Sequence, residues 1–234
     1  MINWFNIILV KPLLNLLVIF YNIVPGHDIG VVIVLLTILI RAAMIPSFHK
    51  SLHSQKKMAD LQPKMNEIRA KYKNDQAEQA KKLMELYKQH KISPFSSCLP
   101  LLIQFPILIA LYQALLIGLS GHNIGSHLYH FVHNPGVLNP YFVHWINLAK
   151  PSVSLGIIAG IVQFIQSKMM MPQTKSNDTA TRAMSAQALY ILPAITVLFS
   201  LKLPAGLPLY WIVMTLVAIV QQYYIMRSNK IEAV

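Results

Sequence analysis

The chain has 234 residues, of which 55% are hydrophobic and only 12% are charged, and its formal net charge is +12. With a mean hydropathy of +0.48, this composition excludes a soluble globular domain and indicates a polytopic membrane protein. The single cysteine, Cys98, excludes an internal disulfide framework and a cysteine-built metal site. The longest polar stretch, about residues 49–94, is too short for a sizeable nucleic-acid-binding domain, so we do not expect DNA as a partner.

Residues 1–25 are predicted to form an amphipathic helix that lies on the membrane surface. Lys11, Asn15 and Asn22 fall within about 40° of one another on a helix, which gives a narrow polar stripe on an apolar cylinder. The segment lacks the basic start and small-residue cleavage site of a signal peptide. The alternative is a sixth span, which would bury Lys11 and Asn15 and place the N-terminus in the cytoplasm.

Five later segments are candidates for membrane spans, because a bilayer core about 30 Å thick requires about 20 apolar residues. The last two are joined by only a few residues and are predicted to form an antiparallel hairpin. Prolines 100, 106, 193 and 208 are expected to kink these helices without ending them. The chain therefore reads as an all-α membrane protein with spans at 26–49, 95–119, 152–172, 186–201 and 205–227.

The distribution of charge orients these spans. The 120–151 loop carries only Lys150, which places it outside the cytoplasm, with the N-terminus outside as well. The 173–185 loop, which carries Lys175 and Arg182, and the 228–234 tail, which carries Lys230 directly after Arg227, are assigned to the cytoplasm. The strongest signal is the 50–94 segment, which contains eleven basic and five acidic residues and is therefore assigned to the cytoplasm. The basic residues are Lys50, Lys56, Lys57, Lys64, Arg69, Lys71, Lys73, Lys81, Lys82, Lys88 and Lys91, and the acidic residues are Asp60, Glu67, Asp75, Glu78 and Glu85.

The same 50–94 segment is predicted to be a cytoplasmic helical hairpin. Apolar residues recur at spacings of three and four on both sides of the sequence KNDQAE, so each arm has a seam that the other can cover. Asp75, with Glu78 three residues later, resembles a helix N-cap and places the turn near Asn74. We expect Pro63 to kink the first arm. The seams are Met58, Leu61, Met65, Ile68 and Tyr72, and Ala80, Leu83 and Tyr87.

Arg41 is the one charged residue within the apolar run VVIVLLTILIRAAMIPSF. It lies about 10 Å inside the predicted end of its span, and a central arginine costs at least about 2.5 kcal/mol of insertion free energy. None of the eight acidic residues falls inside a predicted span. The guanidinium must therefore be satisfied by water, carbonyl groups, polar side chains or a visiting group.

Other polar residues in the spans are candidates to line a hydrated cavity around Arg41. Any single one of them is more simply explained as an interhelical hydrogen-bonding group, but an unpaired buried cation favours a shared pocket. The set comprises Thr37 one turn before Arg41, Gln104 in the second span, Gln163, Gln166 and Ser167 in the third, and Trp211, Thr215 and Gln222 in the fifth.

At four places the sequence resembles the YidC/Oxa/Alb membrane protein insertases. These are LLTILIRAAMIPSF, KMADLQPKMNEIRAKY, CLPLLIQFPILIALYQAL and LPAGLPLYWIVMTLVAIVQQYYIM, which together cover about residues 29–227. The resemblance implies a five-helix core with a groove open to the cytoplasm and to lipid but closed outside. It places the single groove arginine at Arg41, and the polar groove positions at Gln104, at Gln163 or Gln166, and at Trp211.

The resemblance also implies a multi-pass protein of the bacterial cytoplasmic membrane whose partners are nascent membrane protein clients and the lipid bilayer, and it permits a ribosome and a Sec-type translocon. No cofactor is expected. The chain departs from Gram-negative members in showing no large extracytoplasmic domain before the first span, and from many Gram-positive members in lacking a lipoprotein cysteine near its start. The short tail after Arg227 argues against an organellar origin.

Two other classes of function fit the sequence less well. A secondary transporter or channel for small solutes would usually carry intramembrane carboxylates, and the predicted spans have none. An intramembrane enzyme or metal protein would have to use Cys98 or the loop histidines, which no acidic residue or cysteine accompanies. We interpret the histidines as exposed loop residues; they are His122, His127, His130 and His133.

Overall fold

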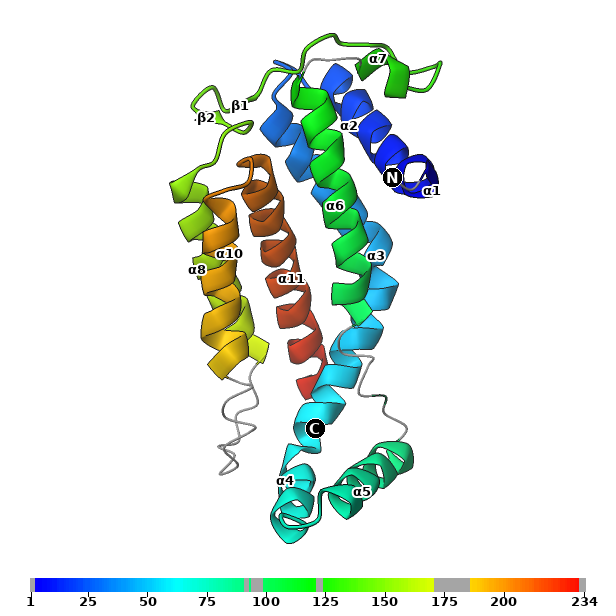
Figure 1. The fold of residues 1–234 in the computed structure, drawn as a ribbon, viewed down its shortest axis with the longest axis vertical. Coiled ribbons are helices and arrows are strands. Elements are labelled where there is room, and N and C mark those ends of the chain that lie inside the picture. Colours follow the sequence, from blue (N-terminus) through cyan, green and yellow to red (C-terminus); the bar gives the residue numbers. More distant parts are fainter. Residues whose placement is uncertain (1–2, 91–92, 94–98, 121–123, 171–185, 232–234) are drawn as a thin grey trace.

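The computed structural model describes residues 3–90, 93, 99–120, 124–170 and 186–231, and most of them are helical (Figure 1). The predictions that concern Cys98, His122, the 173–185 loop and the last three residues of the tail lie outside the described residues. The elements in chain order are α1 (Asn3–Phe5), the π-helical turn η1 (Asn6–Val10), α2 (Lys11–Ile23), α3 (Ile29–Asp60), α4 (Gln62–Lys71), α5 (Gln76–Gln89), α6 (Leu99–Ser120), α7 (Ile124–His127), β1 (Tyr141–Phe142), β2 (Ile146–Asn147), α8 (Val153–Met170), the π-helical turn η3 (Gln187–Ile191), α10 (Leu192–Ser200) and α11 (Gly206–Ile231).

The chain is an all-α polytopic membrane protein, as its composition predicts. Four segments of the described chain are long and apolar enough to cross a bilayer, namely Asn6–Ile23, the helix Ile29–Asp60, Leu102–Ser120 and Gly206–Tyr224. The third and fourth predicted spans form the shorter apolar helices Val153–Met169 and Leu189–Ser200. The surface location of the N-terminal helix stays a prediction, because its length and apolarity also suit a span.

The long helices lie side by side in an ordered row (Figure 1). α3 packs along α11, α11 packs against α8, and α8 packs against α10, while α2 packs on both α3 and α6, and α6 also contacts α3 and α11. The predicted hairpin of the last two spans therefore needs a correction. α10 and α11 are joined by a short connection and run antiparallel, but α10 packs chiefly on α8, because its neighbour is decided by close helix packing and not by the length of the loop.

Two glycines bring α8 and α10 together. A Cβ atom added at Gly156 would lie 2.8 Å from the Cβ of Ser200, and one added at Gly160 would lie 2.5 Å from a Val197 methyl carbon. Their spacing of four residues is the small-xxx-small pattern that lets membrane helices approach closely. Lipid chains are as apolar as the helix surfaces, so the hydrophobic effect does not drive helices together within the bilayer. The close van der Waals contact at the two glycines therefore favours the packing of α8 on α10.

We expect Gly160→Leu to lower the free energy of unfolding by about 1–3 kcal/mol, because the larger side chain overpacks the α8–α10 contact. Thermal unfolding of the purified protein in detergent measures this effect. Ile157→Leu is the matched control, since Ile157 lies on the same helix but is exposed. Equal unfolding temperatures for the two variants would contradict the close contact.

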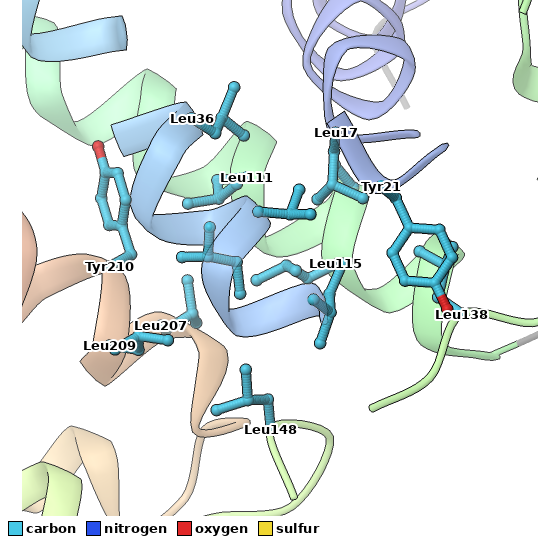
Figure 2. Packing of buried hydrophobic residues seen from close by; sticks show 14 of the residues in the cluster. Leu17, Tyr21, Leu36, Leu111, Leu115, Leu138, Leu148, Leu207, Leu209 and Tyr210 are labelled. Atoms are coloured by element: carbon cyan, nitrogen blue, oxygen red, sulfur yellow. The ribbon is translucent and has the colours of Figure 1, made fainter. Parts of the chain in front are cut away.

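The hydrophobic core lies at the end of the bundle that carries the 124–151 loop. Leucines from α2, the first half of α3, the second half of α6 and the first turn of α11 meet there, and Leu138 and Leu148 of the loop close it (Figure 2). The fully buried members include Leu14, Leu17, Leu36, Leu111 and Leu115. Arg41 and Gln104 lie beyond this core, in the direction of α4 and α5.

The polar stripe of the N-terminal helix is covered by the loop. Asn15 donates from Nδ2 to the carbonyl oxygen of His127 (3.1 Å) and accepts at Oδ1 from the amide of Tyr129 (2.6 Å). The Nζ atom of Lys11 lies 5.2 Å from the centre of the Tyr129 ring, and Asn22 donates to the carbonyl oxygen of His133. Contacts with the 124–151 loop therefore engage Lys11, Asn15 and Asn22, the polar stripe from which the location on the membrane surface was predicted.

The helical hairpin follows the sequence pattern closely. α4 and α5 pack through Leu61, Met65 and Leu86, which are buried in a cluster of their own, separate from the core of the bundle. Asp75 caps α5 by accepting at its Oδ1 atom from the amide of Glu78 (3.0 Å), so the predicted N-cap is confirmed. Ala80, assigned to the seam, is exposed instead, and Leu86 takes the buried position.

Several boundaries differ from the predictions. α3 does not end near residue 49 but continues through Pro46 to Asp60, and α4 begins directly after Leu61 with Pro63 in its first turn. Pro208 lies in the first turn of α11, where proline is tolerated because the first amides of an α-helix have no intrahelical partner. Pro193 is the second residue of α10 and follows the π-helical turn η3 without a break, so it lies within one continuous helical run, as predicted. Pro106 lies inside α6, as predicted.

Candidate functional site

Arg41 is buried between α3 and α11, with 7% of its surface exposed. Its Nη2 atom donates to the carbonyl oxygen of Met214 at 3.0 Å. The guanidinium carbon lies 4.5 Å from the centre of the Phe48 ring, which supplies a cation–π contact. Its Nε atom is buried and has no hydrogen-bond partner. Of the partners that the sequence left open for Arg41, the structure shows a carbonyl group, and it adds the Phe48 ring, which the sequence analysis did not consider.

The ion pairs in the described part of the chain lie elsewhere. Lys81 and Lys82 pair with Glu78, and Lys82 also donates to Glu85 at 2.8 Å, all on the hairpin helix α5. This hydrogen bond lowers the pKa of Glu85 and raises the pKa of Lys82. No described carboxylate forms an ion pair with Arg41, so its positive charge is not neutralised by the protein around it.

Tyr210 joins Arg41 to the second helix of the site. Its side chain is fully buried at the edge of the core, and the hydroxyl group is directed away from Leu207 and Leu148 (Figure 2). The hydroxyl oxygen accepts a hydrogen bond from Nε2 of Gln104 on α6 (2.6 Å), and Tyr210 lies one helical turn before Met214, whose carbonyl group accepts from Arg41. Gln104, Tyr210 and Arg41 therefore form one polar cluster that links α6, α11 and α3.

The other predicted residues lie around this cluster with partners of their own. Thr37 donates to the carbonyl oxygen of Ile33, and Thr215 to that of Trp211, so both hydroxyl groups are satisfied within their helices. Trp211 is half-buried. Gln163 accepts a 3.5 Å hydrogen bond from Thr196 and so contacts α10. Gln166 is half-buried on α8.

Sequence reasoning missed Phe48 and Tyr210. Both had a signal in principle, because Phe48 lies two helical turns after Arg41 on the same face, and a buried tyrosine usually finds a hydrogen-bond partner for its hydroxyl group. Phe48 also packs with Leu52 and Ala218 in a small buried cluster, on the side of Arg41 that faces the hairpin. Gln222 is buried as well, and its Oε1 atom has no partner.

A double-mutant cycle tests the Gln104–Tyr210 contact. Tyr210→Phe removes the acceptor of the half-buried Gln104 amide group, so we expect a loss of about 0.5–1.5 kcal/mol in unfolding free energy. Adding Gln104→Leu to that variant removes the orphaned donor and should recover part of the loss. Chemical unfolding in detergent measures all four proteins, and strictly additive effects would contradict the contact.

The cluster can attract an anion, but the residues that surround it offer no acid–base or nucleophilic pair. The loop histidines that invited a metal site are separate from it, and His127, His130 and His133 are exposed. Among the described residues, no group of three or more histidine, cysteine, aspartate or glutamate side chains is arranged to hold a metal ion. The chemistry available at the site is electrostatic attraction and hydrogen-bond donation.

Comparisons with known proteins place the chain in a family. A family model described as 60Kd inner membrane protein matches residues 19–232. The chain is 36% identical over 227 residues to a protein of Geobacter metallireducens named membrane protein insertase YidC, covering 97% of this chain and 38% of that relative. A protein of the same name from Geobacter sulfurreducens matches equally, at 36% identity over 227 residues.

A third relative is close to this chain in length. The protein of Fusobacterium nucleatum that is also named membrane protein insertase YidC is 34% identical over 204 residues, which cover 86% of this chain and 88% of the relative. The chain thus spans about 38% of the length of the Geobacter relatives and most of the length of this one. The match covers the helices that hold Arg41, Gln104 and Tyr210, and the chain belongs to the 60Kd inner membrane protein family, the YidC/Oxa/Alb family that its sequence resembles.

Proposed function

We propose that this chain is a membrane protein insertase, which lets short polar segments of nascent membrane proteins cross the bilayer and releases their apolar helices into lipid. The observation that carries the proposal is the buried Arg41, whose Nε atom has no partner and which forms no ion pair with the described carboxylates. The names of the relatives, membrane protein insertase YidC, support the same activity.

Arg41 would act by holding an acidic or polar client tail partway across the membrane. A guanidinium offers five N–H donors, and here one of them is engaged by the carbonyl group of Met214. Surroundings of low dielectric strengthen its attraction for a carboxylate. Because contact with water or a client would satisfy the remaining donors, we propose that Arg41, Thr37, Gln104, Gln163, Gln166, Trp211 and Thr215 line a hydrated groove open to the cytoplasm.

Apolar faces of α6 and α11 would then guide the client helix into lipid. Ile109 and Leu116 are exposed on α6, and Leu216 and Val220 are exposed on α11. A client helix of about 20 apolar residues gains enough free energy on entering the bilayer to drive its own insertion. The protein would then lower the free-energy barrier to insertion without supplying energy of its own, since its sequence has no motif for binding a nucleotide.

The proposed orientation follows from charge. The basic hairpin α4–α5 would lie in the cytoplasm and the 124–151 loop outside, with the N-terminus outside and the C-terminus inside. The bacterial cytoplasmic membrane is the proposed location. The positive surface of the hairpin would suit a ribosome or anionic lipid headgroups, and a Sec-type translocon is a further candidate partner.

Site-specific photo-crosslinking in cells tests the proposal. A crosslinking amino acid at position 104 or 211, both half-buried beside the cluster, should capture nascent membrane proteins with short translocated tails. The matched control is position 195 on α10, where Ile195 is exposed. Equal capture of clients at all three positions, or no capture at positions 104 and 211, would contradict the proposed client path. Capture of a small solute in place of clients would favour a transporter.

A further inference from the structure

The loop between α6 and α8 carries large aromatic side chains that project away from the protein. Trp145 is 87% exposed and Phe131 is 78% exposed, although aromatic residues usually bury most of their surface. Val137 and Val143 are exposed beside them in sequence. The 124–151 segment has a single charged residue, Lys150. An exposed surface this apolar and this poor in charge indicates a partner.

Trp145 is held in this position by a strained and anchored turn. Val143 and His144, which join β1 to β2, have φ angles of 50° and 63°, in the left-handed region that a β-branched residue rarely adopts. The amide of Val143 donates to Oδ2 of Asp28 at 2.6 Å, and Asp28 also caps the first turn of α3. Strain of this kind persists only where the surrounding structure fixes it. The turn therefore presents Trp145 outward from a rigid base.

The position of the turn suggests what it touches. The β1–β2 hairpin lies at the end of the bundle opposite α4 and α5, on the side of α8 and α10 (Figure 1). The neighbouring start of α8 exposes Val153, Ile157 and Ile158, so the apolar surface of the loop continues the apolar surface of the spans. Tryptophan and other aromatic rings concentrate at the level of lipid headgroups, where one edge is apolar and the other wet.

We propose that Trp145 and Phe131 are an interfacial anchor, which inserts into the headgroup region of the lipid leaflet at this end of the bundle. The loop then rests on the membrane and holds the ends of α3 and α8 at a fixed depth. The only charge nearby in sequence, Lys150, is a cation and suits lipid phosphate groups. This role is independent of what the protein does to a client.

Tryptophan fluorescence in vesicles tests the anchor. Replacing Trp4 and Trp211 with phenylalanine leaves Trp145 as the only tryptophan of the full chain. The protein is reconstituted in phosphatidylcholine–phosphatidylglycerol vesicles that contain phosphatidylcholine brominated either near the headgroup or near the end of the acyl chain. A matched control chain carries Trp145→Phe and Asn74→Trp as well, which moves the reporter to the exposed turn between α4 and α5.

The anchor predicts that Trp145 emits at shorter wavelength than indole in water and is quenched more strongly by bromine near the headgroup than by bromine near the chain end. The control should emit as in water and be quenched by neither lipid. Water-like emission of Trp145 without lipid quenching would overturn the proposal. Emission that depends on the protein-to-lipid ratio but not on bromine would also overturn it, in favour of contact with a second copy of the chain.

Discussion

Arg41→Ala should slow the insertion of clients with acidic translocated tails by about ten- to a hundredfold. A hydrogen bond to a charged group is worth about 1.5–3 kcal/mol, and each 1.36 kcal/mol of barrier changes a rate tenfold. Arg41→Lys should retain much of the activity, because it keeps the positive charge although it loses the fork of donors. Insertion in vesicles or cells is measured by protease protection of the tail.

A client whose tail has neutral residues in place of its acidic ones provides the matched control. Its insertion should depend much less on Arg41, because the lost interaction is with a negative charge. If the Arg41→Ala variant inserts every acidic-tailed client as well as the unchanged protein does, the positive charge of Arg41 does not act on the client. A fall in insertion that is the same for acidic and neutral tails would point to a structural role for Arg41.

Deleting residues 56–90 should impair the engagement of clients or ribosomes while the bundle stays folded. The hairpin core of Leu61, Met65 and Leu86 is separate from the core of the bundle, so its removal leaves the packing of the spans intact. Co-purification of ribosomes and client insertion measure the loss, and the helical content of the purified variant checks its fold.

A variant that only separates the two arms refines this test. Met65→Asp places a charge in the hairpin core and should unpack α4 from α5 without shortening the chain. If the deletion leaves insertion untouched, the hairpin is merely a linker between α3 and α6. If the deletion and Met65→Asp impair insertion alike, the paired arms are the active form of the hairpin.

Local sequence signals predicted the hairpin and the buried arginine well. The Asp75 cap depends on residues three apart, and the apolar seams depend on spacings of three and four, so both can be found without tertiary information. Arg41 could be singled out because a charge inside an apolar span is costly wherever the helix packs. These features are determined by short stretches of chain or by transfer energies.

Features set by packing between distant segments could not be predicted in the same way. The stripe of Lys11, Asn15 and Asn22 is satisfied by a loop more than one hundred residues away, as the separation of 112 between Asn15 and His127 shows. The pairing of α10 with α8 follows from Gly156 and Gly160, whose effect depends on Ser200 and Val197 opposite them. Gln163 was assigned to the groove, and its hydrogen bond to Thr196 depends on that same pairing.

The most direct test of the account is insertion by the purified protein in liposomes without ATP. A short-tailed client, released from any ribosome or chaperone, should insert when this protein is present and fail to insert in empty liposomes. Because a membrane potential contributes about 2.3 kcal/mol per charge per 100 mV, a potential positive outside should increase the insertion of an acidic tail. Insertion without ATP, slowed in Arg41→Ala when the client tail is acidic, is the result that the account predicts, and a strict requirement for ATP in this purified system would contradict it.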